Sequence, residues 1–186
     1  VKFILRKSFH PDLRGGSNTY SGITWHVNKG IPEVYWGVVG SDDRSFVASA
    51  KWDGAKAEFG RFFEYKEVPP ADMALPNELL IRTESGHEYL YVVLNGNNKV
   101  IKQDLITGDT VWIADPGVAP YGLAMAAGKL YVTTWAGRTP LPADTEVAGI
   151  PWGKARVNNK AGGGTREGSV TVIDPKTGTR IKELLV

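Results

Sequence analysis

The chain has 186 residues, of which 42% are hydrophobic and 23% are charged, and its formal net charge is +2. This composition excludes a disordered chain, the lack of an 18-residue apolar run excludes a membrane-spanning helix, and the small charge gives no reason to expect nucleic acid as a partner. The absence of cysteine excludes disulfides, zinc–thiolate sites and a thiol nucleophile. The 22 glycines, 11 prolines and 6 tryptophans favour many short strands joined by tight turns.

The N-terminal part of the sequence has weak strand signals. Residues 1–32 predict poorly defined strands, the clearest at 23–27, where the composition is β-branched and aromatic. Residues 33–73 predict a degenerate unit, with three strands at 33–40, 46–48 and 61–68 and a turn around Asp53. Its last strand ends at two prolines.

Residues 78–114 predict a cleaner unit with four strands, at 79–83, 89–94, 100–104 and 109–114. Between the last two, the pattern D-x-x-T-G predicts a tight hairpin, because the Asp104 carboxylate can accept turn N–H groups and Gly108 can take a positive φ. Residues 90–93 are apolar on both faces of their strand. We therefore expect this sheet to be covered on both sides.

The sequence then repeats itself. The triplet LYV at 90–92 returns forty positions later at 130–132, and the stretch 100–111 returns seventy positions later at 170–181 with its D-x-x-T-G pattern. The offset grows by about thirty residues, so the second copy contains one long insertion. The last unit therefore has predicted strands at 121–125, 129–135, 169–174 and 179–185, and a repeat of roughly 40 residues is typical of β-propeller blades.

We therefore predict an all-β chain that forms part of a β-propeller with four-stranded antiparallel blades, about four in this chain. Its parts are the poorly defined strands 1–32, a degenerate blade 33–73, a blade 74–115, and a blade 116–186 whose insertion 136–167 joins its second and third strands. An incomplete propeller exposes apolar faces and strand edges, so we expect the remaining blades as partners and interpret the chain as a piece of something longer.

The repeated motifs resemble the YVTN-type, YncE-like β-propeller repeat, and residues 117–124 (GVAPYGLA) are similar to the start of such a blade. The insertion, and the repeat motif that resumes after it at 168–174, resemble bacterial proteins that join an N-terminal seven-bladed propeller to a C-terminal alkaline-phosphatase-type phosphoesterase domain. This resemblance implies that the chain is part of a seven-bladed propeller in the periplasm or outside the cell. It also implies a phosphoesterase domain as a partner, whose activity is carried by no residue of this chain.

The insertion is the part of the sequence in which we expect a ligand site. It joins second and third strands, so it belongs to the same rim of the propeller as residues 95–98 and 116–121. Loops of this length commonly bind ligands, and basic and tryptophan side chains here suit an anion, a glycan or a phosphate ester. A solvated loop that packs against a neighbouring domain is the alternative. The candidate ligand-binding residues are Trp135, Arg138, Trp152, Lys154, Arg156, Lys160 and Arg166.

These observations favour a non-catalytic binding or scaffold module, and we assign no catalytic residue, metal ligand or cofactor. The three histidines are isolated in the sequence, and the acidic pairs have the positions of turn caps. One alternative is a propeller enzyme of the lactonase or quinone-dependent dehydrogenase type, but the strands expected at its central channel offer only Arg82. Another is a single-stranded nucleic-acid binder that uses tryptophan and basic residues.

Overall fold

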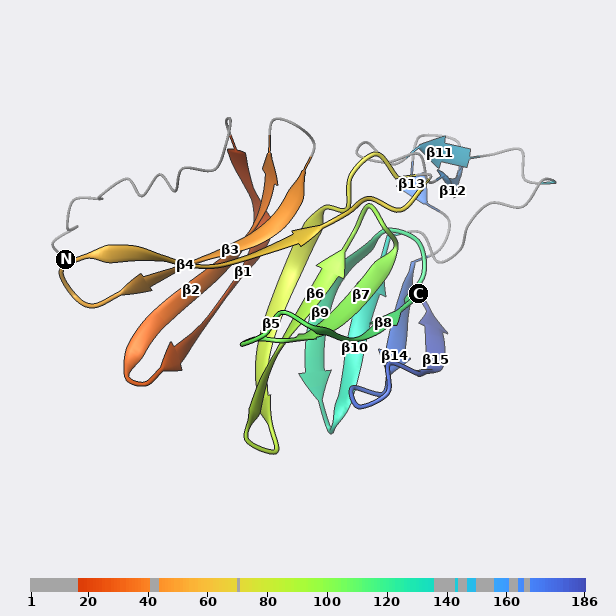
Figure 1. The fold of residues 1–186 in the computed structure, drawn as a ribbon. Coiled ribbons are helices and arrows are strands. Elements are labelled where there is room, and N and C mark those ends of the chain that lie inside the picture. Colours follow the sequence, from red (N-terminus) through yellow and green to blue (C-terminus); the bar gives the residue numbers. More distant parts are fainter. Residues whose placement is uncertain are drawn as a thin grey trace, which may run out of the picture.

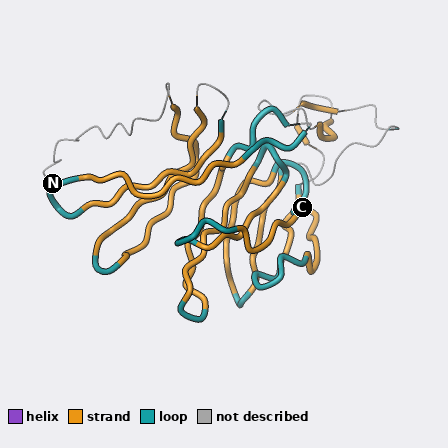
Figure 2. Tube along the Cα trace, in the orientation of Figure 1, coloured by secondary structure: helices purple, strands orange, loops and turns teal. Residues whose placement is uncertain are grey.

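The computed structural model is all-β (Figures 1 and 2). It describes residues 17–40, 44–69, 71–135, 143, 147–149, 156–160, 164–165 and 168–186, and for 17–21, 147–149, 156–160 and 164–165 it describes the backbone alone. Every regular element in these ranges is a β-strand. Within the same ranges there is no helix with the length and apolar content needed to cross a membrane.

Three antiparallel four-stranded sheets follow one another along the chain, each with its strands paired in sequence order. The first sheet consists of β1 (Ser17–Asn28), β2 (Ile31–Gly40), β3 (Ser45–Trp52) and β4 (Ala57–Tyr65). The second consists of β5 (Pro76–Glu84), β6 (His87–Leu94), β7 (Lys99–Asp104) and β8 (Thr110–Ala114). The third consists of β9 (Pro120–Ala126), β10 (Lys129–Thr134), β14 (Ser169–Ile173) and β15 (Arg180–Leu185).

The insertion interrupts the third sheet between β10 and β14, which pair directly with each other. Its described backbone forms a small sheet of three short strands, β11 (Val147–Gly149), β12 (Arg156–Lys160) and β13 (Gly164–Thr165). Because the two flanking strands still pair in register, the insertion leaves the four-stranded pattern of the third sheet intact.

The all-β class and the four-stranded antiparallel units are confirmed, but the described residues form three such sheets and not about four. The difference arises at the N-terminus. There β1 is a strand of 12 residues that pairs with β2, so the strand signal at 23–27 and the unit expected from residue 33 belong to one sheet. A weak strand signal gives no information on pairing, because pairing depends on a partner strand elsewhere in the chain.

The second sheet is covered on both faces, as its apolar pattern predicted. Leu90 and Val92 belong to a core shared with the first sheet, whereas Tyr91 and Val93 belong to a core shared with the third. All four side chains are fully buried. The first strands of successive sheets also pack together, β1 with β5 and β5 with β9. The three sheets therefore meet along the edges formed by their first strands (Figure 1).

The two D-x-x-T-G turns have the predicted geometry. The Asp104 Oδ1 atom accepts the N–H groups of Ile106 and Thr107, each at 2.8 Å, and these bonds, that of Thr107 first, lower the pKa of the carboxyl. The φ angles of Gly108 and Gly178 are 81° and 74°.

Both turn glycines also meet the preceding sheet. A Cβ atom on Gly108 would lie 3.0 Å from the Phe63 ring of β4, and one on Gly178 would lie 2.8 Å from the Trp112 ring of β8. Each turn therefore packs on an aromatic ring of the outermost strand of the sheet before it. This repeated contact fixes how far one sheet is shifted along the next.

Candidate functional site

The rim that carries the insertion is held together by asparagine side chains. The Asn98 Oδ1 atom accepts the N–H of Ala119 at 2.8 Å, and Asn95 Nδ2 donates to the Pro120 carbonyl at 2.6 Å. The N–H of Trp135, at the start of the insertion, donates to the Ala119 carbonyl at 3.1 Å. The β6–β7, β8–β9 and β10–β14 connections therefore lie beside one another at this edge.

The same asparagine turn also holds the connection from the first to the second sheet. The backbone N–H groups of Asn95 and Gly96 donate to the carbonyls of Leu75 and Ala74 at 2.9 and 3.0 Å. Asn97 accepts the N–H of Val68 and donates to the Lys66 carbonyl, both at 2.9 Å. The sequence predicted only a turn here. The asparagine side chains are the sequence signal for this additional role, because an amide group both donates and accepts hydrogen bonds and so can bridge two backbone segments.

Two exposed aromatic rings lie on this rim. The rings of Tyr121 and Trp135 are stacked, with centroids 5.3 Å apart and an interplanar angle of 19°. Tyr121 is 36% exposed and Trp135 is 43% exposed. Exposed, rigid aromatic faces combine a large apolar area with a low entropy cost and suit a planar or ring-shaped ligand.

The structure describes part of the predicted ligand patch. It places Trp135 against Tyr121, and it places the backbones of Arg156 and Lys160 at the two ends of β12 in the small sheet. The side chains of Arg156 and Lys160 lie outside what the structure describes. So do the remaining members of the predicted patch, which are Arg138, Trp152, Lys154 and Arg166.

The strand register shows that the three sheets carry apolar residues at equivalent positions. In the second and third sheets, two apolar pairs on the first two strands face the preceding sheet, and in the first sheet two equivalent pairs lie on the face turned away from the second sheet. These pairs are Leu79–Val92 and Ile81–Leu90 in the second sheet, Leu123–Val132 and Met125–Leu130 in the third, and Ile23–Trp36 and Trp25–Val34 in the first.

These equivalent positions differ in burial. In the second and third sheets the second-strand members are fully buried, because the preceding sheet covers them. In the first sheet, the second-strand members are less buried, since Val34 is 36% exposed and Trp36 is half-buried beside Val38 and Phe46 of the same sheet. The first-strand members Ile23 and Trp25 are each 66% exposed. We call this surface the outer face of the first sheet, and no other sheet of the described residues packs on it. Exposed apolar patches of this kind mark interaction sites.

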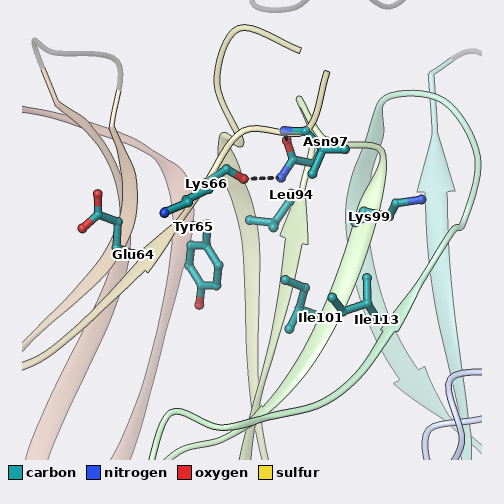
Figure 3. A pocket seen from close by; sticks show the side chains of 9 residues that line it. Glu64, Tyr65, Lys66, Leu94, Asn97, Lys99, Ile101 and Ile113 are labelled. Carbon is teal, nitrogen blue, oxygen red and sulfur yellow. Dashed lines mark hydrogen bonds between the residues drawn. The ribbon is translucent and has the colours of Figure 1, made fainter. Parts of the chain in front are cut away.

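A smaller groove lies between β4 and the outer strands of the second sheet (Figure 3). Its volume is about 250 Å³, and its lining includes Leu94 and Ile101 together with Lys66 and Lys99. Asn97 closes one side through its bond to the Lys66 carbonyl. This volume is below the range of about 300–1,000 Å³ that is usual for small-molecule sites, so we interpret the groove as a packing gap between sheets.

The junction of the first and second sheets contains a buried polar cluster around His26. Its Nδ1 atom lies 2.9 Å from Glu88 Oε1, and its Nε2 atom lies 3.7 Å from Glu33 Oε2. Glu33 is fully buried and accepts a 2.6 Å hydrogen bond from Ser49. Burial, followed by the charge of Glu33, raises the pKa of the neighbouring Tyr35.

This cluster connects two sheets, since His26 comes from β1 and Glu88 from β6. The sequence showed His26 as isolated, because the residues that surround it are distant along the chain or lie on another strand. Within the described ranges, no group of three or more histidine or acidic side chains has an arrangement that would hold a metal ion.

No protein-family model matches the chain, and a search of curated proteins finds no match. The YVTN-type resemblance therefore depends on the repeated motifs alone and stays a prediction.

Proposed function

We propose that the chain is a non-catalytic binding or scaffold module whose three sheets are blades of a larger β-propeller. The observation that carries this proposal is the outer face of the first sheet. Its apolar positions match those that a neighbouring sheet covers in the second and third sheets, yet Ile23 and Trp25 are largely exposed.

The partner that fits this face is another four-stranded sheet. The same pairs of positions are covered by a sheet in two independent cases within this chain, and the first strands β1, β5 and β9 lie along one common edge. Covering Ile23 and Trp25 would contribute about 2 kcal/mol for each side chain. We therefore propose the remaining blades as the partner at this face.

Self-association tests this proposal, because a second copy of the chain is the nearest substitute for a missing sheet. We expect the chain to associate at micromolar concentrations and the double variant Ile23→Lys, Trp25→Lys to remain monomeric, since a charged side chain cannot be buried without a partner. Sedimentation velocity over a range of concentrations measures this. The control is Ile106→Lys, an apolar residue in the β7–β8 turn that is 54% exposed. Equal association of the double variant and the control would contradict the proposal.

We also propose that the rim that carries the insertion contacts an anionic or glycan ligand, or a phosphoesterase domain of the same gene product, in the periplasm or outside the cell. The stacked pair of Tyr121 and Trp135 supports this proposal, since both rings are exposed beside the start of the insertion. The insertion also supplies the basic residues Arg156 and Lys160.

A sulfated oligosaccharide serves as the test ligand for this rim. We expect Trp135→Ala to weaken its binding about tenfold, because ring stacking is lost, and the double variant Arg156→Ala, Lys160→Ala to remove most of the salt dependence. Calorimetric titration at two salt concentrations measures both effects. The matched control is Trp52→Ala, because Trp52 is also 43% exposed but lies on the first sheet. If Trp52→Ala weakened oligosaccharide binding as much as Trp135→Ala, the rim would not be the binding site.

A further inference from the structure

A cavity of about 530 Å³ lies between the second and third sheets on the side of the hairpin turns. It is bordered by the β5–β6 turn, the β9–β10 turn and the D-x-x-T-G turn of the third sheet. Its volume falls within the range of about 300–1,000 Å³ that is usual for small-molecule sites. It is separate from the rim that carries the insertion, and no candidate residue of that rim lines it.

The base of the cavity is a buried ion pair. Lys102, on β7, is 3% exposed, and its Nζ atom lies 2.6 Å from Glu84 Oε2. The same atom donates to the Pro175 carbonyl at 3.1 Å and lies 4.1 Å from the centroid of the Tyr89 ring. The three donor directions of the ammonium group are therefore all in use.

Glu84 is the group at this base that can still bind a ligand. Its Oε1 atom accepts a hydrogen bond from the Tyr91 hydroxyl, and burial, followed by this bond, raises the pKa of the phenol and keeps it a donor. The Glu84 side chain is 28% exposed and lines the cavity, and a carboxylate oxygen that accepts one hydrogen bond has a second lone pair for another donor. Because two donors already hold the Glu84 carboxylate in one orientation, ligand binding costs little further side-chain entropy.

The charges and walls of the cavity define the kind of ligand. Glu84 and Lys102 neutralise each other at the base. The other lysine of the lining, Lys176, is exposed, so solvent and salt screen its charge. Tyr89, Met125 and Val111 provide apolar wall area. A carboxylate acceptor beside an aromatic ring suits a neutral molecule that has hydroxyl donors on an otherwise apolar ring.

We propose that this cavity binds a neutral pyranose sugar. One or two ring hydroxyls donate to the Glu84 carboxylate, and the C–H face of the ring packs against Tyr89 and Met125. His87 and Lys176, which line the same cavity and are exposed, contact the hydroxyls that remain near solvent. The proposal does not depend on the blade or rim functions, because the cavity lies wholly between two sheets that are present in this chain.

The test uses methyl pyranosides of glucose, galactose and mannose, with binding followed by calorimetry or ligand-detected nuclear magnetic resonance. We expect millimolar affinity for at least one of them and a loss of about tenfold in Val111→Trp, whose side chain would fill the cavity. Val111 is 48% exposed, so this change leaves the core intact. The matched control is Ile113→Trp on the same strand, which is 57% exposed and does not line the cavity, and it should change affinity by less than about twofold.

Glu84→Gln provides a second variant that keeps the shape of the side chain. We expect affinity to fall about fivefold or more, because an amide oxygen is a weaker acceptor than a carboxylate, with thermal unfolding used to verify the fold. Two further compounds separate the alternatives. Cyclohexanol binding as tightly as the pyranosides would show an apolar pocket, and tighter binding of glucuronate would show an anion site. Either result, or no pyranoside binding at 50 mM, which is about tenfold above the expected range, overturns the proposal.

Discussion

A Gly96→Ala variant should lose about 3 kcal/mol or more of its free energy of unfolding, which is a large part of the roughly 5–15 kcal/mol of a typical domain. A Cβ atom at this position would lie 2.0 Å from the backbone carbonyl oxygen of Met73. That carbonyl cannot retreat freely, because Gly96 and Asn95 donate their N–H groups to the carbonyls of Ala74 and Leu75. The methyl group would therefore separate the β6–β7 turn from the connection between the first two sheets.

Gly86→Ala is the matched control for this effect. Gly86 has a φ of 82° and open space around it, so alanine there costs only the backbone strain of about 1 kcal/mol. Gly96 has no positive φ, so its cost comes from the lack of space. Urea unfolding of both variants measures the difference. Equal stability of the two variants would show that the asparagine turn does not hold the sheets together.

Lys102→Met should be the second strongly destabilising change, at about 2–3 kcal/mol. Methionine retains the apolar stem but removes the ammonium group, which leaves Glu84 with the Tyr91 hydroxyl alone and removes one of the donors to the Pro175 carbonyl. This loss of unfolding free energy is smaller than for a fully buried ion pair, because Glu84 is 28% exposed and water can reach it.

Lys99→Met on the same strand separates burial from charge. The Lys99–Asp115 pair has a distance of 3.0 Å but is 32% and 64% exposed, so its removal should cost less than about 1 kcal/mol. Adding Glu84→Gln to Lys102→Met should recover part of the loss, since the unpaired charge disappears, and a double-mutant cycle measures this coupling. If the two lysine variants unfolded at the same urea concentration, Lys102 would have no structural role beyond that of a surface lysine.

The features that were predictable from the sequence are those encoded within one strand or one turn. The continuous apolar run of residues 90–93 predicted cover on both faces, and Asp104 with Gly108 predicted a capped hairpin turn. The repeated motif predicted the antiparallel four-stranded pattern. In both copies the second and third strands pair in the same register. Local residue chemistry was sufficient in these cases.

The features that were missed depend on residues far apart in the chain. His26 lies between Glu33 and Glu88, and residue 88 is 62 positions away from it in the sequence. The cavity over Lys102 needs the turn at Pro175, which the insertion places far from β7. At the ligand patch, the neighbour of Trp135 is Tyr121 on β9, which the spacing of basic residues did not indicate.

The outer face of the first sheet is tested most directly by a single cysteine, because the chain has none of its own. In an Ile23→Cys variant, maleimide labelling of the isolated chain should be fast, since residue 23 is 66% exposed. In the larger propeller that we propose, a covering sheet should slow the labelling at least about tenfold, while a Lys56→Cys control, on an exposed turn, is labelled equally in both. Fast labelling of residue 23 in both proteins would contradict the proposal that another sheet covers this face.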